Sequence, residues 1–203
     1  MKISRIETGM LLLFVVLFLF LGPATTYNHT FDHSSPQGWF AMDFGWKSLR
    51  ADILQVTGDS SLRPAFLSAG YVGGPEIYPP LWTHHLALSA SASGLDPAHI
   101  AFFMVMLNLL LMILCCYEIL RKVSTRVALC GLPLGLLMIG LPYAVPAGFG
   151  FHSMVFGHMF LMAGALLILN FSSEKWFGYA LGVVAAAAFL SHPPEAAYLA
   201  GLY

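Results

Sequence analysis

The segment MDFGWKSLRADILQVTG, residues 42–58, holds four charged side chains close together: Asp43, Lys47, Arg50 and Asp52. The group stands out because only 9% of the chain is charged. A carboxylate can accept a proton, and neighbouring cations can stabilise a developing negative charge. The same residues can instead form the solvated side of a helix, with Asp43 as its N-cap at the positive end of the helix dipole. Spacing alone leaves both interpretations open.

The composition of the chain is that of an integral membrane protein. Hydrophobic residues make up 58% of its 203 residues and its mean hydropathy is +0.76. A formal net charge of −1 without a Lys/Arg cluster leaves nothing to hold a nucleic-acid backbone. The three cysteines, Cys115, Cys116 and Cys130, show no CxxC spacing, so neither a disulfide framework nor a zinc knuckle is expected.

The hydropathy pattern predicts an all-α, polytopic membrane protein with about five transmembrane helices. A spanning helix needs about 20 mainly apolar residues, and the candidates cover residues 6–22, 99–120, 127–147, 151–171 and 176–192. We interpret residues 1–203 as a single membrane domain, in which residues 23–98 form a long loop and residues 99–203 hold the further spans. The last residues are still apolar, so we expect the N-terminal part of a larger protein.

Positively charged residues near the span ends predict the orientation of the chain. If the spans alternate, one side of the membrane collects Lys2, Arg5, Arg121, Lys122, Arg126 and Lys175. Because cytoplasmic loops carry the excess of Lys and Arg, this side should be the cytoplasm. The N-terminus is then cytoplasmic, and residues 23–98 lie outside.

The same topology places the histidines at or near the outer face. His192 falls at the outer end of the fifth span, Pro193 and Pro194 should break the helix there, and Glu195 follows. We expect His192 and Glu195 to approach the outer loop from this side. His158 lies about two turns deep in the fourth span, where ionisable groups are costly. It is either a functional residue or a neutral histidine bonded to a neighbouring helix.

The outer loop should contain two short helices that lie against the membrane surface. The first, over residues 44–57, is too short and too charged to span, and its apolar stripe consists of Trp46, Leu49, Ile53 and Val56. Gly58 is placed to end it. A second apolar helix is predicted over residues 81–93, after a Pro-Pro pair and before Gly94.

These features together resemble the first outer loop of the GT-C superfamily of membrane glycosyltransferases. The order is an acidic residue beyond the first span, an amphipathic helix running to a glycine, and then YPPLWTHHLALSASASGLDP, residues 78–97. That stretch is similar to (Y/K)PPL…LLALL…GL(S/D)P in polyprenyl-linked sugar transferases. HPPEAAYLAGLY, residues 192–203, resembles a later segment in which a His-Pro pair opens the outer end of a span. The resemblance covers residues 6–125, and elsewhere it is mostly a hydropathy pattern.

The resemblance implies an enzyme that moves a sugar from a lipid-phosphate carrier to an acceptor at the outer face by inverting chemistry. It implies Asp43 as general base on the acceptor hydroxyl, or as a ligand of a divalent cation such as Mg or Mn, with His192 as a second candidate ligand. No other acid stands beside Asp43, which favours chemistry without a metal, and Asp32 is a rival base because it lies closer to the first span. The substrate-binding candidates are Lys47, Arg50, Arg63, Glu76, Tyr78, His84, His85, His192 and Glu195.

Two other classes of function stay open. A transporter, channel or non-catalytic assembly subunit would use broken helices and outer histidines to line a path, although such proteins usually carry polar residues near the middle of several spans. A histidine-ligated metal or haem protein would need spacings such as H-x₃-H, which the eight histidines do not show on a span. The polar groups gathered in one outer loop favour surface chemistry. The expected partners are membrane lipids, a lipid-phosphate-linked sugar and an acceptor of unknown kind, and no nucleic acid.

Overall fold

The computed structural model describes residues 4–25, 42–58, 80–140 and 152–203, and the secondary-structure elements within these ranges are all α-helices. They are α1 (Arg5–Thr25), α2 (Met42–Thr57), α3 (Leu81–Ser93), α4 (Pro97–Val123), α5 (Thr125–Gly140), α7 (His152–Phe171), α8 (Phe177–Ser191) and α9 (Pro193–Leu202). The predicted all-α fold class is confirmed for the described part of the chain.

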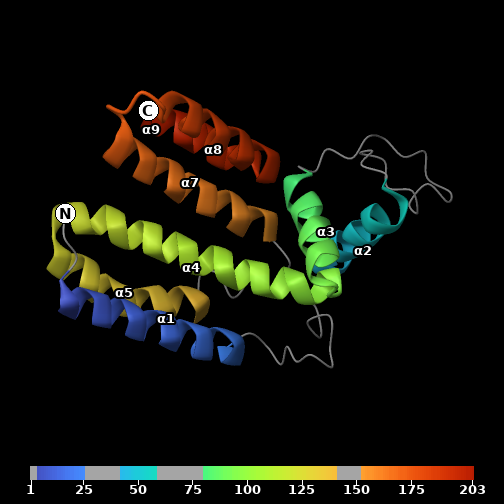
Figure 1. Cartoon of the computed structure of the whole chain (residues 1–203), viewed down its shortest axis with the longest axis horizontal. Coiled ribbons are helices and arrows are strands. Elements are labelled where there is room, and N and C mark those ends of the chain that lie inside the picture. The colour runs from blue at the N-terminus through green and yellow to red at the C-terminus, as the bar shows by residue number, and fades with distance from the viewer. Residues whose placement is uncertain (1–3, 26–41, 59–79, 141–151) are drawn as a thin grey trace.

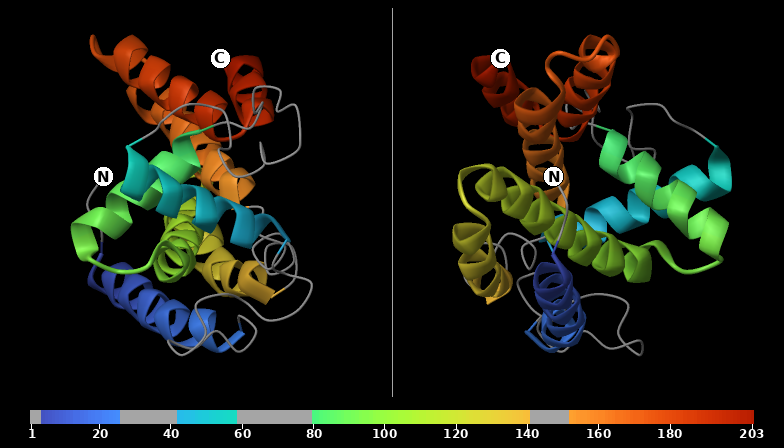
Figure 2. Two further views of the ribbon diagram at one scale, coloured as in Figure 1. Left: turned by 90° about the vertical axis from the view of Figure 1, so that its right-hand side faces the viewer. Right: turned by 60° about the vertical axis from the view of Figure 1, so that its left-hand side comes forward.

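Helix α4 forms the centre of a helical bundle (Figure 1). α1 and α5 pack on one side of α4 and α7 packs on the other, with α8 and α9 against α7. α2 and α3 contact each other and α4, and they lie across the end of the bundle where α4 begins. Figure 2 shows this crossing from two further directions. We call this end of the bundle the α2–α3 end.

Close helix packing holds the centre of the bundle together. Apolar side chains of α1, α3, α4 and α7 form one buried cluster, in which Trp82 and Leu86 of α3 are fully buried. On α5, a Cβ at Gly135 would lie 2.7 Å from Cγ2 of Ile113 on α4. Small residues at such contacts let two helices approach closely, as is common between helices in membranes.

Two of the described helices contain segments that are long and apolar enough to cross a membrane: His99–Val123 in α4 and Ser153–Phe171 in α7. Thr125–Leu136 and Phe177–Ser191 are shorter apolar segments. α1 covers the predicted first span, residues 6–22. α5 ends at Gly140, and the rest of the predicted third span, residues 141–147, lies outside the described residues.

Both predicted loop helices are present. α3 covers residues 81–93 as predicted, and α2 begins at Met42 rather than at residue 44. Asp43 therefore lies inside the first turn of α2, so its predicted position as the N-cap is wrong by a residue or two, the usual uncertainty of a helix end. Gly58 and Gly94 have φ angles of 65° and 70°, a left-handed conformation that suits glycine at the end of a helix.

α2 packs on the protein through a different face from its predicted apolar stripe. Ser48 and Ala51 are buried, and Leu54 packs against the core. Leu49 and Val56, which belong to the stripe, are 43% and 87% exposed. Ile53 is partly buried. Leu49 and Val56 are thus left largely uncovered by the described residues, as expected for a helix whose apolar side meets a lipid surface.

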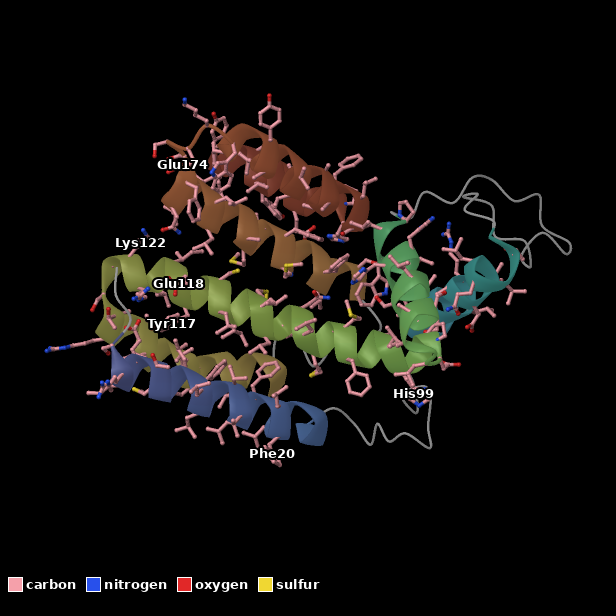
Figure 3. The ribbon with its side chains drawn as sticks, in the orientation of Figure 1. Phe20, His99, Tyr117, Glu118, Lys122 and Glu174 are labelled. Atoms are coloured by element: carbon pink, nitrogen blue, oxygen red, sulfur yellow. The ribbon has the colours of Figure 1, made fainter. Side chains whose placement is uncertain are left out.

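The charged residues divide between the two ends of the bundle. The end opposite α2 and α3 carries Arg5, Glu7, Glu118, Arg121, Lys122, Arg126, Glu174 and Lys175. Figure 3 shows Glu118, Lys122 and Glu174 there and His99 at the α2–α3 end. We call it the cationic end, because Lys and Arg outnumber Glu among its described residues. The predicted gathering of Lys and Arg on one side is present in the fold, and the assignment of that side to the cytoplasm stays a prediction.

Candidate functional site

The junction between α8 and α9 turns the chain sharply at the α2–α3 end. α8 ends at Ser191, and His192 has φ −160° and ψ 103°, the extended conformation favoured before proline. Pro193 and Pro194 then occupy the first turn of α9, where the missing N–H groups break no helical hydrogen bond. Glu195 follows in the same turn, and its backbone N–H donates to the His192 carbonyl over 3.2 Å. The helix break predicted at the proline pair is confirmed.

Glu195 is buried between two histidines. Its side chain is 2% exposed, with Oε1 3.0 Å from Nε2 of His158 and Oε2 2.5 Å from Nδ1 of His192. An ionised carboxylate only accepts hydrogen bonds, so both imidazole nitrogens donate to it. A buried carboxylate is costly unless its oxygens are bonded in this way. The three residues, which we call the Glu195 site, tie α7 to the α8–α9 junction.

His192 has the hydrogen-bond pattern of a general base held by a carboxylate. Because its Nδ1–H donates to Glu195, the neutral imidazole carries its lone pair on Nε2. The His192 side chain is 34% exposed, so part of the imidazole is open to a substrate hydroxyl. The Glu195 carboxylate would stabilise the imidazolium formed when Nε2 accepts a proton. The site can therefore accept a proton or orient a hydroxyl group.

Two glycines of α7 allow α9 to pack this closely. A Cβ at Gly157 would lie 2.9 Å from Cβ of His192 and 3.2 Å from Oε2 of Glu195. A Cβ at Gly164, on the same face of α7, would lie 2.5 Å from Cδ1 of Leu199. A side chain at Gly157 would push the α8–α9 junction away, and one at Gly164 would have to displace the Leu199 side chain. The position of the Glu195 carboxylate thus depends on the sequence of α7 as well as on the proline pair.

α3 meets α7 beside the Glu195 site. His85 stacks on Phe156 with ring centroids 5.4 Å apart and an interplanar angle of 11°, and Trp82 meets the same ring edge-on, also at 5.4 Å. Phe156 directly precedes Gly157. α3 also contacts α8. The second loop helix and the α8–α9 junction therefore come together on α7, which agrees with the expected approach of His192 to the outer loop.

The two histidines of α3 have different surroundings. Burial lowers the pKa of His85, so its imidazole is neutral near pH 7 and stacks as an aromatic ring. His84 places Nδ1 2.9 Å from the Pro80 carbonyl oxygen, so this nitrogen donates within its own helix. Adjacent residues of a helix point about 100° apart, and His85 is the one of the two that contacts α7.

The other sequence-predicted candidates belong to the loop between α1 and α3. Arg50 lies on α2 and is partly buried. Asp52, expected on the wet side of this helix, is also partly buried, and burial together with the charge of Asp96 raises its pKa. Asp43 and Lys47 lie on α2, but the described part of the chain does not include their side chains. Four further candidates lie outside the described residues altogether: Asp32, Arg63, Glu76 and Tyr78.

The donor chemistry of the described residues does not fit a metal centre. Among them, no three His, Cys, Asp or Glu side chains are grouped in a way that could hold a metal ion. At the Glu195 site, both carboxylate oxygens are already bonded to imidazole nitrogens. Among the described residues, His192 therefore lacks the partner ligands that a metal site would need.

A second buried charge group, at the cationic end, was missed by the sequence analysis. Ser4 and Glu7 form a capping box at the start of α1, with two backbone-to-side-chain bonds of 3.2 Å. Oε1 of Glu7 accepts a hydrogen bond from the Tyr117 hydroxyl at 2.5 Å. The same oxygen lies 2.6 Å from Nε of Arg121, and this contact is an ion pair without hydrogen-bond geometry. Arg121 also pairs with Glu118 at 3.4 Å. The S-x-x-E spacing marks Glu7 as a cap, but nothing in the sequence indicates its partners on α4.

Comparisons with known proteins found no matching family model, no matching curated protein and no matching solved structure. The resemblance to the GT-C superfamily therefore stays a prediction from the sequence.

Proposed function

We propose that the chain forms the membrane part of a glycosyltransferase that moves a sugar from a lipid-phosphate carrier to an acceptor at the outer face. The observation that supports this most is the Glu195 site, where a buried carboxylate and two histidines meet beside α3. These three residues lie at the α2–α3 end of the bundle, next to the loop helices. A lipid-linked donor would present its phosphate at this level, where the spans leave the membrane.

In this proposal the chain crosses the membrane about five times, with the cationic end in the cytoplasm and residues 23–98 outside. Apolar side chains on the surface of α1 support the membrane setting: Leu12, Leu13 and Phe20 are 62%, 59% and 76% exposed. Figure 3 shows Phe20 pointing away from the bundle. Soluble monomeric proteins rarely expose large contiguous apolar surfaces of this kind.

The proposed reaction replaces one C–O bond with another. The acceptor hydroxyl oxygen attacks the anomeric carbon of the sugar on the face opposite the phosphate. The bond to the lipid phosphate breaks, and its electron pair stays on the phosphate oxygen. Asp43, on the first turn of α2, takes the hydroxyl proton as general base. Lys47 and Arg50 stabilise the charge that develops on the departing phosphate.

The Glu195 site has a positioning role in this scheme. Nε2 of His192 accepts a hydrogen bond from a hydroxyl of the sugar or acceptor, and Glu195 fixes the imidazole in the tautomer that can do so. Because Glu195 is also bonded to His158 on α7, the imidazole orientation is tied to the membrane bundle. Preorganised groups of this kind reduce the entropic cost of bringing two substrates together.

The complete protein in lipid vesicles provides the test. A labelled sugar on a synthetic polyprenyl phosphate is supplied on the outer side, together with a membrane extract as the source of acceptor. We expect the lipid phosphate to be released and the label to appear on another molecule, only when the extract is present. Intact donor after prolonged incubation of well-inserted protein would argue against a transferase.

A transporter is the second candidate, and the broken α8–α9 helix favours it. Discontinuous helices with polar groups at the break often form binding sites in transporters. Here the break at His192 is followed by the buried Glu195. Uptake of a labelled solute by the same vesicles, without consumption of a lipid-linked sugar, would support this candidate over the first.

A further inference from the structure

A polar pocket lies between α4 and α7 at the cationic end, far along the bundle from the Glu195 site. Its volume is about 200 Å³, and it is lined by Glu118, Arg121 and Lys122 of α4 and Asn170 of α7. A water molecule in the liquid occupies about 30 Å³, so the pocket has room for a group of several heavy atoms. Figure 3 shows Glu118 and Lys122 side by side at this end of α4.

Arg121 is held in place within this pocket. Its side chain is 8% exposed, and it is fixed by Glu7 through Nε and by Glu118 through Nη1, at 2.6 Å and 3.4 Å. The guanidinium group has five N–H donors in a planar fork, so these two contacts leave donors for a further anion. The hydrogen bond that the Tyr117 hydroxyl donates to Glu7 in turn holds this partner of Arg121 in place. Arg121 is therefore a preorganised donor, because these contacts hold it in position before a ligand binds.

Lys122 adds a second positive charge on the exposed rim of the pocket. It forms no ion pair with any residue that the structure describes. Asn170 donates from Nδ2 to the Leu166 carbonyl over 2.9 Å, which holds its amide at the pocket wall. A planar cationic fork, a mobile ammonium and an amide are donors suited to the oxygens of a phosphate group.

We propose that this pocket binds the phosphate group of an anionic lipid headgroup at the cytoplasmic surface. Basic pockets between membrane helices on the cytoplasmic side are known to hold such headgroups, and the anionic leaflet attracts cations there. A soluble phosphate compound would offer the same chemistry. The proposal does not depend on sugar transfer, because it concerns the opposite end of the bundle.

The negative charge of Glu118 allows a test in which two variants should change the affinity for phosphate in opposite directions. Its side chain is 39% exposed and lines the same pocket, so its carboxylate repels a bound phosphate. Glu118→Gln should tighten phosphate binding, and Lys122→Gln should weaken it, each by about fivefold. Glu118→Gln keeps the side-chain length, Lys122→Gln shortens the side chain by one atom, and both leave the Glu7 contacts of Arg121 intact. Lys175→Gln is the matched control, because Lys175 lies at the same end but does not line the pocket.

The experiment titrates phosphatidylglycerol into the full chain in uncharged detergent and measures the 1:1 lipid adduct by native mass spectrometry. The parent protein should bind one phosphatidylglycerol in preference to phosphatidylcholine. The affinity for phosphatidylglycerol should rise in Glu118→Gln and fall in Lys122→Gln, and in the control it should stay within twofold of the parent value. Glycerol phosphate or inorganic phosphate is added as a competitor in a second series. Displacement of the lipid at millimolar competitor would identify a soluble phosphate as the ligand. Equal affinity for the two lipids, or equal shifts in all three variants, would overturn the proposal.

Discussion

Replacing Glu195 by Gln tests whether the buried carboxylate organises the α8–α9 junction. Glutamine keeps the shape of the side chain but presents one acceptor and one donor in place of two acceptors. One imidazole can keep a neutral hydrogen bond, while the other must lose its bond or change tautomer. Loss of one buried bond costs about 1–3 kcal/mol. His192 is 34% exposed and can turn toward water, which places the expected loss in the lower half of that range, at about 1–2 kcal/mol.

The assay is reversible unfolding of the chain in mixed micelles, followed by tryptophan fluorescence or circular dichroism. Glu174→Gln is the control, because Glu174 is exposed in the turn between α7 and α8, and its change should stay within about 0.5 kcal/mol. If Glu195→Gln and Glu174→Gln unfold alike, the carboxylate does not hold the junction together, and the packing around it must be sufficient alone.

Three further predictions concern packing, the cationic end and topology. Gly157→Ala should destabilise the chain by about 1–3 kcal/mol, because the added Cβ meets Cβ of His192 at the α8–α9 junction. Gly178→Ala, with open space around it, should be neutral or slightly stabilising in the same unfolding assay. Tyr117→Phe removes the hydroxyl that donates to Glu7, and we expect a loss of about 1.5–3 kcal/mol in unfolding free energy. An unchanged midpoint of the unfolding transition would mean that this hydrogen bond is not formed in the membrane. A cysteine at Ser60 should react with an impermeant thiol reagent on intact cells, and reaction only after lysis would reverse the predicted orientation.

Local features of the fold could be predicted from the sequence. The period of apolar residues and the glycines that take positive φ located α2 and α3, and the proline pair located the break after α8. Each of these signals acts within a few residues, because it reflects backbone sterics or helix periodicity. The pairing of Glu118 with Arg121 is predictable for the same reason, since residues three apart share a helix face.

The contacts between distant segments could not be predicted in the same way. The Glu7–Tyr117 bond joins residues 110 positions apart, and no periodicity links them. The sequence analysis placed His158 and Glu195 on the same side of the membrane without pairing them. Their contact depends on α9 folding back along α7, which requires both the proline break and the space left by Gly157. Such contacts arise from packing, which a single sequence encodes only through many residues at once.

The most direct test of the proposed function compares Asp43→Asn with Asp32→Asn in the complete protein. Both variants should insert and unfold like the parent, because asparagine keeps the size and polarity of aspartate. General-base catalysis contributes about 10²- to 10⁴-fold, so Asp43→Asn should lose a factor in that range in transfer from a polyprenyl-phosphate sugar, while Asp32→Asn should lose far less. Full transfer activity in Asp43→Asn, with loss of activity in Asp32→Asn, would contradict the assignment of the base and show that the outer loop has been aligned wrongly.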